Sequence, residues 1–251
     1  MLARALALAL ASTLLPAALA QEPKGGEGRR KPPEGRVLAP DAEVAKKLAE
    51  RLAVDPRYAE DGTVELIYGF ASDDELADWT FEGFDKADEA RIGGRAGRRR
   101  PAAPAKGQAR ALELGVSSND AGLMRHTLAF VGDFELLLTL RVDRSTGESD
   151  LVLFRGEAGL RWGGQLVRRS GGAFRPVAGE PDREPFAGGR VATLRLVHRD
   201  GKLTAFAQGK ERAETGKLME HLDGQVGLFV RGMLLRIDRI ELRGKPDPKK
   251  L

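Results

Sequence analysis

The chain of 251 residues contains no cysteine, so no disulfide can staple its fold. Stability must therefore come from a hydrophobic core, or from a core assisted by a metal ion. Aromatic residues make up only 6% of the chain, which argues against a strong binder of crystalline polysaccharide. The 3 histidines are dispersed without a ligand spacing such as H-x-x-x-H, which argues against a zinc site.

Long apolar runs are also scarce, and the longest one lies at the N-terminus. Arg4 is followed by an apolar run over 5–15 and by Ala18-Leu19-Ala20, a small-x-small cleavage site. This pattern predicts a signal peptide over 1–20 and an exported protein, periplasmic or extracellular. The run is too short for a membrane span, which needs about twenty apolar residues.

The net charge of +4 is too small to indicate nucleic acid or a membrane surface. Residues 21–40 are rich in Pro, Gly and charge, so we expect a disordered linker there. Residues 91–110 form a low-complexity loop that is basic and lacks both acidic and aromatic residues. Such a loop is either solvated or able to contact an anionic or protein partner, but it offers no platform for stacking bases. Residues 245–251 form a charged tail.

One amphipathic helix is predicted over 41–56, ahead of everything else in the fold. Val44, Leu48 and Leu52 form an apolar stripe at helical spacing, and Asp55-Pro56 ends it. The stripe either packs on the following domain or, over 41–54, docks a protein partner.

From 62 to 244 the pattern changes to short apolar runs with a period of two, which is typical of β-strands. In the stretch 132–156, Phe134, Leu136, Leu138, Leu140 and Val142 share one parity, as in a strand with one buried face. The expected strands are 64–70, 79–84, 109–114, 123–130, 134–142, 151–155, 160–168, 191–198, 203–208, 225–230 and 234–242. With no helix between them, these strands predict an all-β fold, an antiparallel two-sheet jelly-roll sandwich.

Two local irregularities are predicted as well. Asp200-Gly201 is typical of a type I′ hairpin turn. In the last strand the apolar parity changes between Ile237 and Ile240, which predicts a β-bulge at Asp238-Arg239.

A set of short motifs in this order resembles the concanavalin A-like lectin/glucanase superfamily. They are Leu76-Ala77-Asp78-Trp79, Asp133-Phe134-Glu135-Leu136, Leu153-Phe154-Arg155, Thr193-Leu194-Arg195-Leu196, Gly224-Gln225-Val226-Gly227-Leu228 and Ile237-Asp238-Arg239-Ile240. Within it, the chain looks most like the 3-keto-disaccharide hydrolase-like and laminin G-like domains of secreted bacterial proteins. The resemblance covers roughly 64–243 and implies a concave sheet that binds or processes saccharide.

The resemblance leaves three functions open. The first is an exported, non-catalytic module that binds a glycan or serves as an accessory domain. The second is a glycoside hydrolase that acts on a glycan or keto-disaccharide through paired carboxylates. The third is a structural or protein-interaction domain of the cell surface. Where the hydrolase-like family usually has Asn-Ser-Gly, this chain has Glu148-Ser149-Asp150, which favours the first function.

The carboxylates that could serve catalysis are Glu148, Asp150 and Glu157. A retaining glycosidase needs two carboxylates about 5 Å apart. The laminarinase-type motif Glu-x-Asp-x-x-Glu is matched here only in its first half, because Leu153 stands where the last Glu belongs. A solvated turn is the alternative interpretation.

The ligand-binding candidates surround Trp162, which lies among Gly and Arg rather than among aliphatic residues. They are Arg155, Glu157, Arg161, Trp162 and Gln165, with His126 added if it lies on an exposed strand face. Trp162 could instead cap the edge of the core, whereas Trp79 is expected in the core.

Asp238 is the one metal candidate. The resemblance implies that an acidic residue of the terminal strand can hold a structural Ca²⁺, and oxygen ligands suit this ion. The alternative is an ion pair between Asp238 and Arg236 or Arg239. No other cofactor is expected.

Overall fold

The computed structural model describes residues 42–84, 91–92, 111–116, 120–180, 190–215 and 222–251. The predicted signal peptide and linker, and residues 93–110 of the predicted basic loop, lie outside these ranges. The elements are α1 (Ala42–Arg51), β1 (Arg57–Tyr58), β2 (Val64–Tyr68), a 3-10 helix η1 (Asp73–Asp78), β3 (Trp79–Glu82), β4 (Arg91–Ile92), β5 (Leu112–Gly115), β6 (Ala121–Arg155), β7 (Ala158–Arg161), β8 (Leu166–Ser170), β9 (Ala173–Ala178), β10 (Val191–Arg199), β11 (Lys202–Ala207), β12 (Lys210–Thr215) and β13 (Gly224–Pro246).

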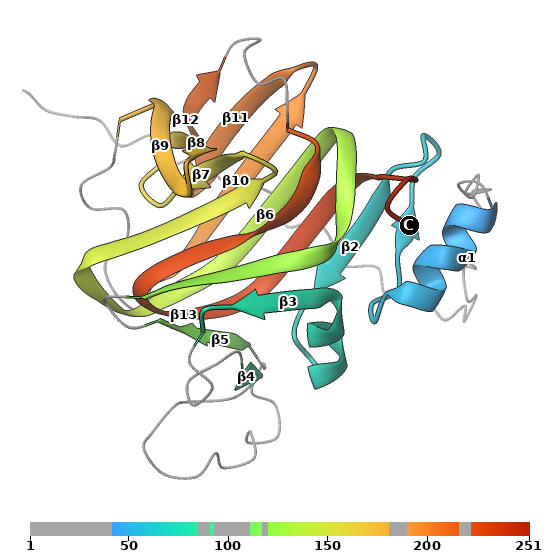
Figure 1. The fold of residues 1–251 in the computed structure, drawn as a ribbon, viewed down its shortest axis with the longest axis horizontal. Coiled ribbons are helices and arrows are strands. Elements are labelled where there is room, and N and C mark those ends of the chain that lie inside the picture. Colours follow the sequence, from blue (N-terminus) through green and yellow to red (C-terminus); the bar gives the residue numbers. More distant parts are fainter. Residues whose placement is uncertain (1–41, 85–90, 93–110, 117–119, 181–189, 216–221) are drawn as a thin grey trace, which may run out of the picture. The chain divides into compact units, whose positions relative to one another are not determined.

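Two long strands, β6 and β13, each bend and take part in both layers of a sandwich (Figure 1). The first sheet runs in the order β3, β6 (121–126), β13 (226–231), β6 (150–155), β7, β8 and β9. The second sheet runs in the order β1, β2, β13 (240–244), β6 (134–142), β10, β11 and β12. In each paired stretch, the residue numbers in β6 decrease while those in β13 increase. The two strands therefore run antiparallel to each other there. The predicted jelly roll is therefore confirmed.

Glycines with left-handed backbone mark the corners where the long strands change sheet. Gly132, with φ of +64°, separates the first-sheet and second-sheet stretches of β6. Gly232, with φ of +57°, does the same in β13. Residues with a Cβ rarely adopt this conformation, so glycine is favoured at both places.

The core lies between the sheets and follows the period of two seen in the sequence. Leu136, Leu138 and Leu140 from the second sheet are at most 1% exposed, as are Leu153 and Leu228 from the first. Both predicted irregularities are present. Asp200 and Gly201 have positive φ at the β10–β11 turn, and Asp238 is the unpaired residue where the register shifts between Ile237 and Arg239.

Two strand predictions were wrong in detail. The predicted strand 160–168 is two strands, β7 and β8, because Gly163 and Gly164 both have positive φ and turn the chain back. The strands β9 and β12 were missed, since their exposed residues give them no clear alternation. The two-residue strands β1 and β4 were missed as well, and β4 lies at the start of the predicted basic loop.

The helix α1 uses its apolar stripe within the fold. Leu48 is fully buried, and Val44 and Leu52 pack against the main core. Arg51 donates to the backbone oxygens of Thr127 and Lys250, which ties the helix to the sheet and to the C-terminal segment. The apolar side of this helix is thus occupied by the domain itself.

Candidate functional site

The outer face of the first sheet, turned away from the main core, carries a second apolar cluster. Val152, Phe154, Val167 and Phe174 are its buried members, with Leu123 and Phe229 partly buried against them. The Phe174 ring centroid lies 5.9 Å from that of Phe154 and 5.6 Å from that of Phe229. An apolar cluster on the outside of a sandwich is unusual, because outer faces are normally polar.

The β8–β9 hairpin contributes to this outer face by bringing Phe174 onto it. The backbone oxygen of Phe174 accepts a hydrogen bond of 2.9 Å from Arg161 Nη2 on β7. The strands next to Phe154 and Val152 have glycine where these side chains pack closely. A Cβ at Gly227 would lie 2.8 Å from the Phe154 ring, and one at Gly159 would lie 2.7 Å from Val152.

A row of three charged residues crosses the same outer face on neighbouring strands. Arg231 of β13 is the register partner of Asp150 on β6. The Asp150 carboxylate, however, is bound by Arg161, with Nε at 3.0 Å and Nη2 at 3.2 Å. The Arg231 guanidinium lies 5.8 Å from the centre of the Phe229 ring and has no ion-pair partner among the described residues. One carboxylate thus stands between two guanidiniums.

The outer face of the second sheet is different, because several of its charged side chains are joined in ion pairs. Arg195 also stacks on a ring, that of Phe206 at 5.1 Å, but it forms an ion pair of 2.6 Å with Glu135. Further pairs join Arg141 to Asp238 and Arg239 to Glu241. This laced pattern is typical of a solvated surface. The first sheet therefore offers the better candidate for a binding face.

Of the predicted site residues, the structure brings Asp150 and Arg161 together on this face. Glu157 lies in the turn after β6, where it pairs with Arg168 at 3.2 Å. Asp150 and Glu157 are separated by the last residues of β6, which are extended. At about 3.3 Å per residue, their backbones are therefore roughly 20 Å apart. Glu148 is exposed in the stretch before Asp150. The pair Asp150 and Glu157 is therefore too far apart for either glycosidase geometry.

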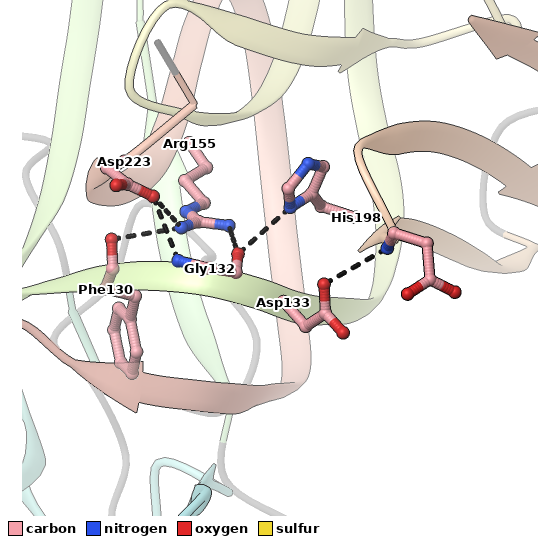
Figure 2. Close-up of polar contacts among 7 residues, drawn as sticks. Phe130, Gly132, Asp133, Arg155, His198 and Asp223 are labelled. Atoms are coloured by element: carbon pink, nitrogen blue, oxygen red, sulfur yellow. Dashed lines mark hydrogen bonds and ion pairs between the residues drawn. The ribbon is translucent and has the colours of Figure 1, made fainter. Parts of the chain in front are cut away.

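Arg155 points into the sandwich instead of out of it, since its side chain is only 2% exposed. Figure 2 shows it at the Gly132 corner, where it donates to the backbone oxygens of Gly132 and Phe130 and to the Asp223 carboxylate. Burial lowers the pKa of Arg155 to about 10, against the opposing effect of the nearby Asp223 carboxylate. In this position Arg155 connects the bend of β6 at Gly132 to the segment before β13 that contains Asp223.

A polar pocket of about 200 Å³ opens beside the same corner, on the second sheet. It is lined by Asp61, Thr63, Asp133, Phe134, Glu135, His198, Arg199, Arg243 and Gly244. His198 Nδ1 donates to the oxygen of Gly132 at 3.0 Å, and Asp133 accepts from the backbone of Asp200 (Figure 2). Glu135 is held by Arg195, and the Phe134 ring is buried. The pocket has polar groups but no exposed aromatic floor for a sugar ring.

The expectation of an exposed His126 was wrong, because this side chain is fully buried. Its Nδ1 accepts from the backbone of Leu128 at 3.0 Å, so Nε2 carries the proton and donates to Tyr68 Oη at 2.6 Å. Tyr68 in turn donates to Asp78, whose other oxygen accepts from the backbone of Ala53. Desolvation lowers the pKa of His126 to about 3. The chain of bonds links the end of α1 to the first sheet.

Trp162 and Gln165 lie in and after the β7–β8 turn. Trp162 is partly buried against the main core, and Gln165 is 9% exposed and reaches the oxygen of Gly179. Trp79 belongs to the core, as expected. Whether Trp162 and Gln165 contact a ligand stays a prediction.

Asp238 is paired with neither Arg236 nor Arg239. Both of its oxygens accept hydrogen bonds from Arg141, at 3.2 and 3.3 Å. Within the described ranges, no group of three or more His, Cys, Asp or Glu side chains could hold a metal ion. A calcium ion at Asp238 would have to displace Arg141, and this site stays a proposal.

Sequence reasoning missed Phe229 and Arg231. Val226, Leu228 and Val230 share the buried parity, so Phe229 falls on the outer parity with Arg231 two residues later. A bulky aromatic residue on the outer parity, followed by an arginine at i+2, was the available signal.

Comparison with known proteins supports the fold. No protein-family model matches the sequence, and no curated protein matches it. A protein of unknown function with a galectin-like fold from Bacillus subtilis matches with a TM-score of 0.51 and 11% identity, over 72% of this chain and 95% of that chain. The cellulose-induced protein Cip1 matches with a TM-score of 0.50 and 10% identity, over 70% of this chain and 96% of that chain. Such likeness shows a galectin-like jelly-roll fold, in agreement with the jelly roll that the sequence predicts.

Proposed function

We propose that the chain is an exported, non-catalytic carbohydrate-binding module whose ligand lies on the outer face of the first sheet. The fold alone does not assign a ligand, because jelly rolls of this kind serve many functions. The observation that carries the proposal is the pairing of the partly exposed Phe229 ring with planar polar groups, Arg231 and the Asp150–Arg161 pair.

This combination suits a saccharide. A sugar ring presents C–H patches that pack on a flat aromatic or apolar surface, and hydroxyls that bond to planar polar groups around it. The first sheet supplies both, with the Phe154–Phe174–Phe229 cluster below and charged side chains beside it.

Two further observations bear on the rest of the proposal. The carboxylates of Asp150 and Glu157 are each engaged by an arginine, which disfavours their use as a general acid and nucleophile. The N-terminal pattern supports export, and none of the described helices has the length and apolarity to cross a membrane.

A glycan array probed with the chain from Gln21 to Leu251 tests the proposal. Phe229→Leu keeps much of the volume but removes the flat ring, so we expect binding to fall about tenfold, in line with loss of a stacked aromatic contact. Phe206→Leu is the matched control, since Phe206 also lies under an arginine but on the second sheet. Equal loss in both variants, or no glycan bound by the unmodified protein, would reject the proposal. Release of reducing sugar by the same protein would revive the hydrolase alternative.

A further inference from the structure

We infer that the outer face of the first sheet selects glycans that carry carboxylate groups, that is, uronic acids, and that Arg231 and Arg161 bind the carboxylate. This inference rests on the proposed function and adds the chemical class of the ligand. It follows from the balance of charge on the face, from the geometry of the Arg231–Asp150–Arg161 row, and from the apolar surface beneath that row.

The charge balance of the outer face is positive. Two of its acidic groups, Asp150 and Glu82, are each already bound by an arginine, Arg161 and Arg125 respectively, and Glu148, exposed just before Asp150, is the remaining carboxylate near this face. Arg231 remains without an ion-pair partner among the described residues. Arg169 adds a further cation, because it is the register partner of Phe174 and shares the outer parity of Val167. No ion pair in the described part of the chain neutralises it, so the face carries an excess of positive charge.

The geometry of the row leaves donors open for an anion. Cross-strand register partners such as Arg231 and Asp150 have Cβ atoms about 5 Å apart. Asp150 nevertheless binds Arg161, through Nε and Nη2, and Arg161 Nη2 also donates to Phe174. Toward the part of the chain that the structure describes, Arg161 Nη1 and the whole guanidinium of Arg231 therefore keep unused N–H donors. A planar carboxylate matches a guanidinium fork through two parallel hydrogen bonds.

The surface beneath the row strengthens this attraction. Arg231 lies over the Phe229 ring, which packs on the buried cluster of Phe154 and Phe174. Next to an apolar surface the effective dielectric is lower than in bulk water, so a charge-assisted hydrogen bond gains strength. The second sheet also has an arginine over a ring, Arg195 on Phe206, but its charge is already taken by Glu135. Of the two arginines that lie over a ring, Arg231 on the first face is the one whose charge is open among the described residues.

Polygalacturonate and alginate are the acidic probes, and fully methyl-esterified polygalacturonate is the neutral counterpart with the same backbone. Calorimetric titration of the chain from Gln21 to Leu251 should show at least about tenfold tighter binding of an acidic probe than of the ester, as expected for one charge-assisted contact. The preference should shrink as salt rises, because screening weakens exposed charge pairs.

Arg231→Gln should weaken binding of the acidic probe about tenfold and binding of the ester much less, because glutamine keeps a planar polar group for hydroxyls but loses the charge. Arg231→Lys should restore part of the loss of the acidic probe. Arg243→Gln is the control, since Arg243 is an exposed arginine of the same strand that lies in the second sheet and lines the pocket beside the Gly132 corner. Thermal unfolding of each variant verifies that it is folded.

A change of opposite sign provides a second test. Asp150→Asn removes the competing carboxylate, so Arg161 becomes available and the acidic probe should bind about threefold tighter or more. Asp238→Asn is its match on the second sheet, because Asp238 is likewise bound by an arginine and its side chain has the same 24% exposure. It should leave the affinity unchanged.

The outcomes separate the two claims. Equal affinity for acid and ester, or loss of neither probe on Arg231→Gln, overturns the acidic preference and leaves glycan binding intact. Loss of the acidic probe on Arg243→Gln instead would move the site to the pocket and overturn the inference. Failure to bind any acidic or neutral glycan would reject the inference together with the proposed function.

Discussion

At the scale of single residues, His126 makes the stability of the protein depend on pH. Its pKa is about 3 in the folded protein because of burial, against about 6.5 in the unfolded chain. Between these values the unfolded state binds one more proton, so stability falls as the pH falls. The contribution is present in full above about pH 6.5 and is lost toward pH 3, with a slope of at most about 1.4 kcal/mol per pH unit.

Urea unfolding of the wild type and of His126→Gln at pH 7, 6, 5 and 4.5 measures this dependence. The variant lacks the titrating group, so its free energy of unfolding should fall less steeply over the same range. Parallel slopes in the two proteins would show that His126 is not the group responsible.

Tyr68 is the centre of the buried chain of hydrogen bonds that includes His126 and Asp78. Tyr68→Phe leaves the Nε2 proton of His126 and one oxygen of Asp78 without partners. We expect a loss of about 1–3 kcal/mol in the free energy of unfolding. Tyr58→Phe is the control, because its hydroxyl makes only a long contact of 3.4 Å to Ala45 and should lose less than ~1 kcal/mol. Similar losses in denaturant titrations of both variants would contradict this account.

The same residues show where prediction from sequence fails. Parity places His126 in line with the buried Met124 and Leu128, yet its polar ring suggested an exposed position. Its hydrogen-bond partner Tyr68, and Asp78 beyond it, belong to other elements. The sequence around His126 gives no sign of these partners. Conversely, Asp150 and Arg161 were found from sequence, but the adjacent Arg231 comes from β13, far along the chain.

At the scale of elements, the corner at Gly232 determines where β13 changes sheet. A Cβ there would lie 2.5 Å from Thr146 Oγ1, and φ is +57°. Gly232→Ala should cost about 1–2 kcal/mol in backbone strain and a further ~1–3 kcal/mol in overpacking. Gly201 has a φ of +74° but open space where a Cβ would lie, so Gly201→Ala should lose only the free energy of the backbone strain. Equal losses in chemical denaturation would argue against the tight corner.

Strand prediction succeeded where one face is buried and failed where both faces are exposed or a turn interrupts the run. The alternation of Leu136, Leu138 and Leu140 located the central strand, and the parity change located the bulge at Asp238. In contrast, β12 has a single buried residue, Ala213, so its sequence shows no alternation. The bends of β6 and β13 between sheets depend on pairing that is distant in sequence.

At the scale of the whole molecule, the sequence predicts that the first twenty residues are removed on export. Expression with the full N-terminus in a secreting bacterial host should yield a protein that begins at Gln21, because Ala18-Leu19-Ala20 is a good cleavage site. Intact-mass measurement of the exported fraction checks this. A mass that retains the first twenty residues, or recovery only from the cytoplasm, would contradict the prediction.

The fold class was predictable for the whole molecule because hydrophobic periodicity and the absence of helical stretches act over the entire chain. The ligand was not, since it depends on which charges the tertiary pairing leaves open. The excess arginine at Arg231 appears only when Asp150 is seen bound to Arg161.

The central claim is that a glycan lies on the outer face of the first sheet, and amide NMR mapping tests it most directly. On titration with a glycan selected by the array, shifts should concentrate in β13 over 226–231, in β6 over 150–155 and in β7. Shifts confined to β10, β11 and β12, or to the pocket around His198, would place the ligand on the second sheet and contradict the account.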